Sequence, residues 1–276
     1  MMKINLKCVL LAFLLLGGSV MANAGNGIKR SEWDFRPEIT TGNVAYFLPA
    51  YAASLFIGQK IMKREMNSSM SGEDVPLWFP QIGFRYTFIG DVSVWQKEIG
   101  KSSLDLTETK ANILDWTNPD FSIGYSVNYT SKQIPFGFRV KLAYDHQSFK
   151  AKQKATNDWT TFSKEMIVPE VVLKILFGSY RTSGTMVSLN VGASYDYVIS
   201  AKNIYKDKKT VNNGFSGIIG FDFAHPSEHI QIGVNYIHPF YDYFNSNFTP
   251  DNGGTYPYKD SKAKLSRMEV FLRYGF

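Results

Sequence analysis

In segment after segment of the chain, polar and apolar residues alternate with a period of two. Between positions 120 and 130 the apolar residues occupy the odd positions and the small or polar residues the even ones. The odd set is Phe121, Ile123, Tyr125, Val127 and Tyr129, and the even set is Ser122, Gly124, Ser126, Asn128 and Thr130. Because successive side chains of a β-strand point to opposite faces, the segment is predicted to be a strand with one apolar and one polar face.

The same alternation predicts strands in most of the chain. Clear examples lie at 78–88, 136–144, 171–177, 187–199, 215–223, 230–236 and 267–276. Counting back from Phe276 gives nine strands, one more than the eight ranges named, and we place a tenth in 43–62, where Pro49 and small residues weaken the pattern. We therefore predict an all-β fold: a closed up-and-down antiparallel transmembrane β-barrel of about 10 strands, within a range of 8 to 12.

The connections between these segments alternate in length. Short turns are expected at about 90–91, 131–135, 180–184 and 224–228, and long polar loops at about 64–75, 100–119, 150–163, 204–213 and 245–262. Short turns on one side and long loops on the other are typical of outer-membrane barrels, whose turns face the periplasm.

The N-terminus has the features of a secretory signal peptide. Lys3 and Lys7 precede an apolar core at 9–16, and a small-x-small site at 22–24 follows it. That core is about half as long as a membrane-spanning helix, so we expect cleavage of residues 1–24, a periplasmic leader at 25–42 and a barrel at 43–276. Cys8, the single cysteine, lies in the expected signal peptide, so the mature chain would have no thiol.

A soluble β-sandwich or ligand-binding barrel alternates in the same way, but with its apolar face inward. Here the polar faces combine Gly and Ser with charges, the apolar faces are rich in Tyr and Phe, and an export signal precedes them. These features favour the membrane barrel and a location in the outer membrane of a Gram-negative bacterium.

The chain resembles the small bacterial outer-membrane β-barrel proteins in its signal peptide, its alternating strands and its terminal segment 268–276. The Tyr- and Asn-rich strands are similar to barrels of the Bacteroidetes. The resemblance implies that the barrel-assembly machinery and periplasmic chaperones are partners. It also implies that the last strand carries the assembly signal, with Phe276 as recognition residue and Val270, Leu272 and Tyr274 as its alternating partners.

Charged residues on the polar faces would line the barrel interior. The basic set is Arg85, Arg139, Lys141, Lys174, Arg267 and Arg273, and the acidic set is Asp145, Glu170, Asp196, Asp222 and Glu269. A barrel of about ten strands is narrow enough for side chains to fill. Two hypotheses stay open: ion pairs plug or gate the lumen, or these are ordinary solvated residues.

The predicted long loops are rich in lysine. The residues are Lys150, Lys152, Lys154, Lys206, Lys208, Lys209, Lys259, Lys262 and Lys264. Such a crown could bind the phosphates of lipopolysaccharide as well as outer-membrane lipid, although lysine runs are also common on solvated surfaces. Without the signal peptide, 28 basic residues face 24 acidic ones, a net charge of +4 that does not suggest nucleic-acid binding.

Candidate catalytic groups are few. Asp145 with His146, and His238 with Asp242, lie near predicted outer strand ends, where an Asp–His pair could act as a general base. Interfacial side chains are the alternative. No phosphate loop, metal-ligand spacing or nucleotide fingerprint occurs in the sequence, so we expect no cofactor and no metal.

The sequence leaves three functions open. The first is a non-enzymatic outer-membrane barrel with a structural, envelope-integrity or surface-interaction role through its loops. The second is a narrow, porin-like channel for small solutes. The third is a rim hydrolase acting on peptides, lipid A or phospholipids. The oligomeric state is open as well.

Overall fold

The computed structural model describes residues 33–43, 46, 49, 52, 81–89, 95–96, 104–111, 120–131, 133–153, 159–178, 186–202, 208–225, 230–248 and 263–274. Side chains are described at these positions except 33–37, 95–96, 104–111, 153, 225, 230, 273 and 274. The strands are β1 (Trp33–Thr41), β2 (Gln81–Ile89), β3 (Trp95–Gln96), β4 (Leu104–Ala111), β5 (Phe121–Thr130), β6 (Phe136–Gln153), β7 (Trp159–Gly178), β8 (Met186–Lys202), β9 (Gly214–His225), β10 (Ile230–Pro239) and β11 (Leu265–Tyr274). A short 3-10 helix, η1 (Lys208–Thr210), precedes β9.

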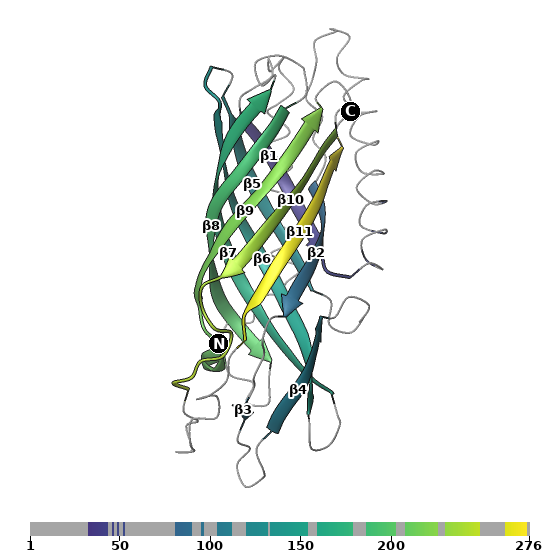
Figure 1. Cartoon of the computed structure of the whole chain (residues 1–276), viewed down its shortest axis with the longest axis vertical. Coiled ribbons are helices and arrows are strands. Elements are labelled where there is room, and N and C mark those ends of the chain that lie inside the picture. Colours follow the sequence, from purple (N-terminus) through teal and green to yellow (C-terminus); the bar gives the residue numbers. More distant parts are fainter. Residues whose placement is uncertain are drawn as a thin grey trace.

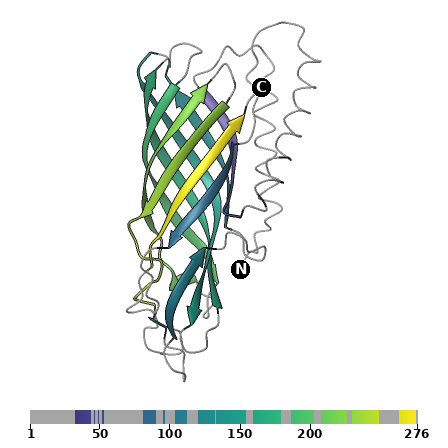
Figure 2. The same cartoon turned by 45° about the vertical axis from the view of Figure 1, so that its right-hand side comes forward.

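Nine strands close into a barrel, which confirms the all-β barrel prediction but not the count of ten. Around the ring the order is β1, β2, β11, β10, β9, β8, β7, β6, β5, and the β6–β7 pairing completes the closed sheet. The tilted strands wrap around a common axis (Figures 1 and 2). Strands β3 and β4 lie outside the ring, where β4 pairs with the far end of β6.

The first strand lies earlier than predicted. β1 occupies Trp33–Thr41, inside the segment 25–42 expected to be a leader, and the described residues of 43–62 belong to no strand. The prediction placed the strand too late because Pro37 and the charges around it resemble an exposed leader. Trp33, Phe35 and Ile39 nevertheless alternate with polar residues, which is the pattern of the other barrel strands.

The barrel is not entirely antiparallel. β1 pairs with β5 in antiparallel register along its whole length, but with β2 in parallel register through Glu38–Thr41 and Gln81–Phe84. An odd number of strands in a closed ring requires at least one parallel pair, because strict alternation of direction cannot return to its start. The last strand, β11, pairs with β2, whereas in a regular up-and-down barrel the last strand pairs with the first.

The two ends of the barrel differ. At one, the turn end, short connections join β5 to β6, β7 to β8 and β9 to β10; Ser131 Oγ accepts hydrogen bonds from the Gln133 and Ile134 amides in the first of them (both 3.2 Å). The opposite end is the loop end. Since Ile89 pairs with Leu265 at the start of β11, β2 finishes at the loop end. The prediction of a short turn-end connection at 90–91 is therefore wrong, because β2 ends at the loop end. Residues 90 and 91 themselves lie outside the described residues.

Part of the predicted loops is strand. β6 and β7 pair from Phe136 with Ile175 to Lys152 with Trp159, so most of the expected loop at 150–163 extends the sheet. β4 likewise lies inside the expected loop at 100–119. The sheet thus projects beyond the ring at the loop end (Figure 1).

The barrel is apolar outside and polar inside. Outward-facing side chains such as Val171 and Phe221, each 58% exposed, form an apolar belt. Its other well-exposed members are Phe88, Phe136, Val140, Leu142, Leu173, Phe177, Val187, Leu189, Val191, Tyr197, Phe215, Ile219, Phe223, Ile232, Tyr236 and Val270. The alternation predicted this two-faced arrangement, and the burial pattern of β5, partly exposed at odd and buried at even positions, follows it.

At the loop end the interior becomes apolar. Phe149, Phe162 and Met166 are fully buried and pack with Phe244 and Phe248 from the segment after β10. Residues 208–213 and 241–248 lie across this cluster, joined by the bridge between Val211 and Phe244 and by the Asn212 side-chain amide, which donates to the carbonyls of Asp242 (2.9 Å) and Phe244 (2.8 Å). We call these two segments the cap.

One close packing contact in the interior can be tested. Gly233 on β10 lies under the ring of the buried Phe271 on β11, and a Cβ at Gly233 would overlap that ring. We expect Gly233→Ala to lower the free energy of unfolding by about 1–3 kcal/mol in urea titrations. Gly217→Ala is the control, because the neighbouring Phe240 ring is 67% exposed and can turn away. Equal losses in both variants would contradict the packing explanation.

Candidate functional site

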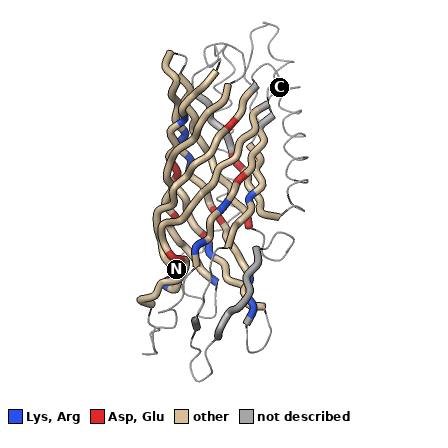
Figure 3. Tube along the Cα trace, in the orientation of Figure 1, with Lys and Arg blue, Asp and Glu red and all other residues tan. Residues whose placement is uncertain are grey.

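The charged residues predicted to face the lumen are inside the barrel. Ten of the eleven have described side chains and all ten are buried: Arg85, Arg139, Lys141, Asp145, Glu170, Lys174, Asp196, Asp222, Arg267 and Glu269. Arg273 lies in β11, but its side chain is outside the described residues. Basic and acidic positions are interspersed along the barrel wall (Figure 3).

Arg85 on β2 organises the largest ion-pair network. Its guanidinium contacts both Asp145 oxygens at 2.5 and 2.7 Å and also pairs with Asp120, and Glu269 lies 3.8 Å away. The carboxylate of Asp120 accepts a further hydrogen bond from Thr87 (2.7 Å). The Arg85 side chain has no exposure, so this single cation is shared by several carboxylates away from water.

Arg267 on β11 extends this network toward the loop end. Its guanidinium lies 2.8 Å from Asp145 and 3.6 Å from Asp196. Asp196 in turn accepts a hydrogen bond from the Tyr241 hydroxyl, and the Tyr241 oxygen accepts one from Lys164 Nζ at 2.8 Å. The chain of contacts therefore runs from β2 to the cap.

Two further groups of ion pairs lie in the lumen. In the first, Arg139 binds Glu170, and Lys141 Nζ lies 3.3 Å from Glu38. In the second, nearer the turn end, Lys174 Nζ lies 3.0 Å from Asp222. Ser188 (2.6 Å) and Asn190 (3.1 Å) also donate to the Asp222 carboxylate. Charge-assisted hydrogen bonds of this kind compensate part of the cost of burying charges.

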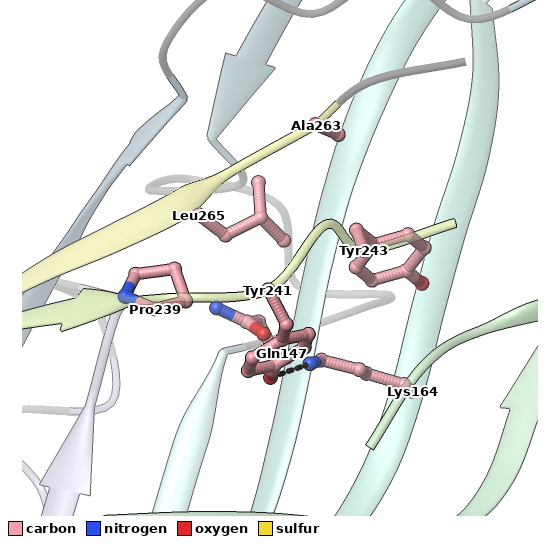
Figure 4. A pocket seen from close by; sticks show the side chains of 7 residues that line it. All are labelled: Gln147, Lys164, Pro239, Tyr241, Tyr243, Ala263 and Leu265. Atoms are coloured by element: carbon pink, nitrogen blue, oxygen red, sulfur yellow. Dashed lines mark hydrogen bonds between the residues drawn. The ribbon is translucent and has the colours of Figure 1, made fainter. Parts of the chain in front are cut away.

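The Lys164–Tyr241–Asp196 contact joins the lumen to the cap. Figure 4 shows Lys164 Nζ bonded to the Tyr241 hydroxyl in a small cavity that Gln147, Tyr243 and Leu265 help to line. The Lys164 ammonium also lies 5.0 and 5.3 Å from the ring centres of Tyr241 and Tyr243, in cation–π range. Burial and the Asp196 carboxylate raise the pKa of Tyr241 well above its usual range, so its hydroxyl stays protonated and donates to Asp196.

Three buried charges were not predicted from the sequence: Glu38, Asp120 and Lys164. Glu38 lies on the unpredicted strand β1. Asp120 and Lys164 lie at even positions, in phase with the inward residues of β5 and β7. Asp120 is the first residue of the predicted strand at 120–130 but was not counted among the lumen charges, and Lys164 precedes the predicted strand at 171–177, so only a longer alternating segment would have included it.

The Asp145–His146 pair does not form a catalytic dyad. Neighbouring residues of a strand point to opposite faces; Asp145 faces inward to Arg85 and Arg267, whereas the His146 ring stacks on Phe121 at 5.4 Å.

The second candidate, His238, has another partner. Its Nδ1 lies 2.9 Å from Ser266 Oγ, and its ring stacks on Tyr236. Asp242 lies in the cap, where its backbone carbonyl accepts the Asn212 amide. A serine beside an imidazole could supply a nucleophile and a base, but Ser266 is buried. These contacts fit an interfacial histidine held by a neighbouring strand.

The remaining predicted residues divide between described and undescribed parts. Val270 is an exposed member of the belt and Leu272 is partly exposed, whereas the side chain of Tyr274 and all of Phe276 lie outside the described residues. Among the predicted loop lysines, Lys208, Lys209 and Lys264 are exposed and Lys150 and Lys152 partly exposed; Lys154, Lys206, Lys259 and Lys262 are outside the described part.

Within the described part of the chain, no group of His, Cys, Asp or Glu has the arrangement of a metal site. The described residues also include no helix of sufficient length and apolarity to cross a bilayer. Comparison of the chain with protein-family models, with curated proteins and with solved structures finds no match.

The Arg85 network predicts a large effect of removing its cation. We expect Arg85→Met to lower the free energy of unfolding by about 3–5 kcal/mol, because Asp120 and Asp145 would lose their shared partner while staying buried. Urea titration measures the loss. Lys202→Met, at an exposed lysine, is the control and should change stability by less than about 0.5 kcal/mol. A loss for Arg85→Met as small as that of the control would contradict the network.

The contact of Tyr241 with the lumen can be tested by a single-atom change. Tyr241→Phe removes the donor to Asp196 and the acceptor for Lys164 while keeping the ring. We expect unfolding to become easier by about 1–3 kcal/mol. Tyr197→Phe, at a belt residue that is 50% exposed, is the matched control. If both variants unfold at the same denaturant concentration, the hydroxyl does not hold the cap.

Proposed function

We propose that this chain is an integral outer-membrane β-barrel with a closed lumen, and that it serves envelope structure or surface interaction through its loop end. One observation carries the proposal: charged side chains are buried inside the barrel while large apolar side chains are exposed outside. A soluble barrel has the opposite polarity, since exposing Val, Leu, Ile and Phe to water costs about 1.5–3 kcal/mol each. A belt of this extent supports contact with lipid.

The sequence features fit the same proposal. A cleaved signal peptide at 1–24 would deliver the chain to the periplasm, where chaperones and the barrel-assembly machinery would act on the last strand. Val270 and Leu272 face outward on β11, as an assembly signal in contact with lipid requires. In this arrangement the turn end faces the periplasm, and the loop end with its cap faces outward.

The filled interior argues against the channel alternative. The described inward-facing charges are all less than 10% exposed, and most are engaged in short ion pairs or hydrogen bonds. The cap and the apolar cluster beneath it add a second obstruction at the loop end. A barrel of nine strands is close to the size at which side chains occupy the whole lumen.

The hydrolase alternative has weaker support. Asp145 is committed to two arginines, His146 faces away from it, and the serine beside His238 is buried. A water-activating or nucleophilic site needs an accessible reacting group, which neither pair provides.

Cell fractionation followed by gel electrophoresis with and without boiling tests the membrane proposal. We expect the mature chain in the outer-membrane fraction, migrating faster when unheated because the closed barrel resists unfolding in detergent. The Arg85→Met variant should lose the fast-migrating band at a lower temperature, since it weakens the interior. Recovery of a water-soluble chain without detergent would refute the proposal.

Bilayer recording on the same purified protein tests the closed lumen. We expect no steady conductance for the unmodified chain. A wide, constant conductance would overturn the closed lumen while leaving the membrane location intact.

A further inference from the structure

Among the described residues, the charged side chains classed as exposed are all lysines, and they all lie at the loop end. All seven described lumen carboxylates are buried: Glu38, Asp120, Asp145, Glu170, Asp196, Asp222 and Glu269. The exposed charged side chains among the described residues are Lys202, Lys208, Lys209 and Lys264, all at the loop end. Glu165, Asp242, Lys150 and Lys152 are partly exposed and cancel in charge. The described residues of the loop end therefore present a net positive surface.

Lys208, Lys209 and Lys264 lie on segments that are hydrogen-bonded to the segment 241–248. Lys208 and Lys209 belong to η1, and Lys264 directly precedes β11. Asn245 links the two segments of the cap, because its backbone amide donates to the Thr210 carbonyl (2.9 Å) and its side chain to the Lys209 carbonyl (2.8 Å). The Tyr243 amide donates to the Ala263 carbonyl at 2.7 Å, next to Lys264. We call Lys208, Lys209 and Lys264 the cap lysines.

The cap beneath these lysines is firmly held. Its Phe244 and Phe248 side chains pack in the apolar cluster with Phe149 and Phe162, and the Asn212 side chain bonds to two of its carbonyls. A backbone fixed in this way loses little entropy when its side chains bind a ligand, which favours affinity. Asp242 is the one described acidic residue of the cap, so the three cap lysines leave a net positive charge.

The cap adjoins the apolar belt at an aromatic rim. Phe240 and Phe215 are 67% and 63% exposed, and the Phe240 amide donates to the Phe215 carbonyl (2.9 Å) where β10 runs into the cap. Aromatic side chains concentrate at the level of lipid headgroups in membrane proteins. If the belt contacts lipid as proposed above, the cap lysines lie next to the headgroup phosphates of one leaflet.

We infer that the cap lysines form a binding site for the phosphate groups of membrane lipids. Lysine ammonium groups bind phosphate oxygens by charge-assisted hydrogen bonds, and the acyl chains of the same lipid would lie against Phe215, Phe240 and the belt. The inference rests on the proposed membrane location and adds to it a ligand class and the residues that select it.

Fluorescence polarisation in a non-ionic detergent tests the site, with fluorescent phosphatidic acid and fluorescent phosphatidylcholine as probes. We expect the folded protein to bind phosphatidic acid at least about tenfold more tightly than phosphatidylcholine, with a preference that falls as salt rises. The combined variant Lys208→Gln, Lys209→Gln, Lys264→Gln should lose that preference.

The matched control removes the same charge elsewhere at the loop end. Lys150→Gln, Lys152→Gln, Lys202→Gln together should retain the preference of the unmodified chain. If both triple variants lose the preference for phosphatidic acid equally, total charge explains the binding and the site is overturned. An unchanged preference in the cap variant would also overturn the site. Competition by millimolar inorganic phosphate as effective as that by unlabelled phosphatidic acid would overturn a lipid as the ligand.

Heat-modified gel migration is measured on every variant first, so that only folded barrels are compared. If the unmodified chain keeps the fast-migrating band but shows no preference for phosphatidic acid, this inference alone is refuted. A chain recovered without detergent refutes the membrane proposal on which it rests.

Discussion

The pairing of charges inside the barrel is the constraint on which the rest of the structure depends. Arg85 and Arg267 each contact carboxylates from other strands, and neither side chain is more than 3% exposed. A buried charge without its partner costs several kcal/mol, so the register of β2, β6, β8 and β11 must bring these groups together. The strand pairing and the ion pairs therefore specify each other.

The same constraint explains the division of the interior into charged and apolar parts. Where the ring of strands is complete, many inward positions carry ions and amides that bond to one another. Beyond it, where β6, β7 and β8 project at the loop end, Phe149, Phe162 and Met166 form a conventional apolar core. The Lys164–Tyr241–Asp196 contact lies at the boundary, because Tyr241 has an apolar ring and a hydroxyl that reaches the ions.

Much of this arrangement could be predicted from the sequence because alternation is a local property. It identified the polar faces of most ring strands and the charges they carry, including Lys174 and Asp222. Applied strictly, it would also have excluded Asp145 with His146, since adjacent strand residues cannot share a face. The partner of each ion could not be predicted, because pairs such as Arg85 with Asp145 are 60 residues apart and depend on the register of the closed sheet.

The number of ring strands could not be predicted from local alternation for a related reason. The ring closes through a parallel pairing of β1 with β2, and the alternation within each segment does not reveal which strands pair. Pro37 made a strand at β1 harder to predict, because proline is rare within strands. It lies outside the residues of β1 that pair with β2. The two-residue β3 and the out-of-ring β4 similarly depend on the projecting end of β6.

The position of β1 has a consequence for how the barrel could open. β5 runs antiparallel to β1, and β1 runs parallel to β2, so β2 and β5 would be antiparallel neighbours if β1 were withdrawn. Without β1, the directions of the other eight ring strands would alternate throughout, as in a regular meander. The β1–β2 pairing joins only four residue pairs and is the shortest strand pairing described in the ring. Separating these two strands breaks the fewest backbone hydrogen bonds.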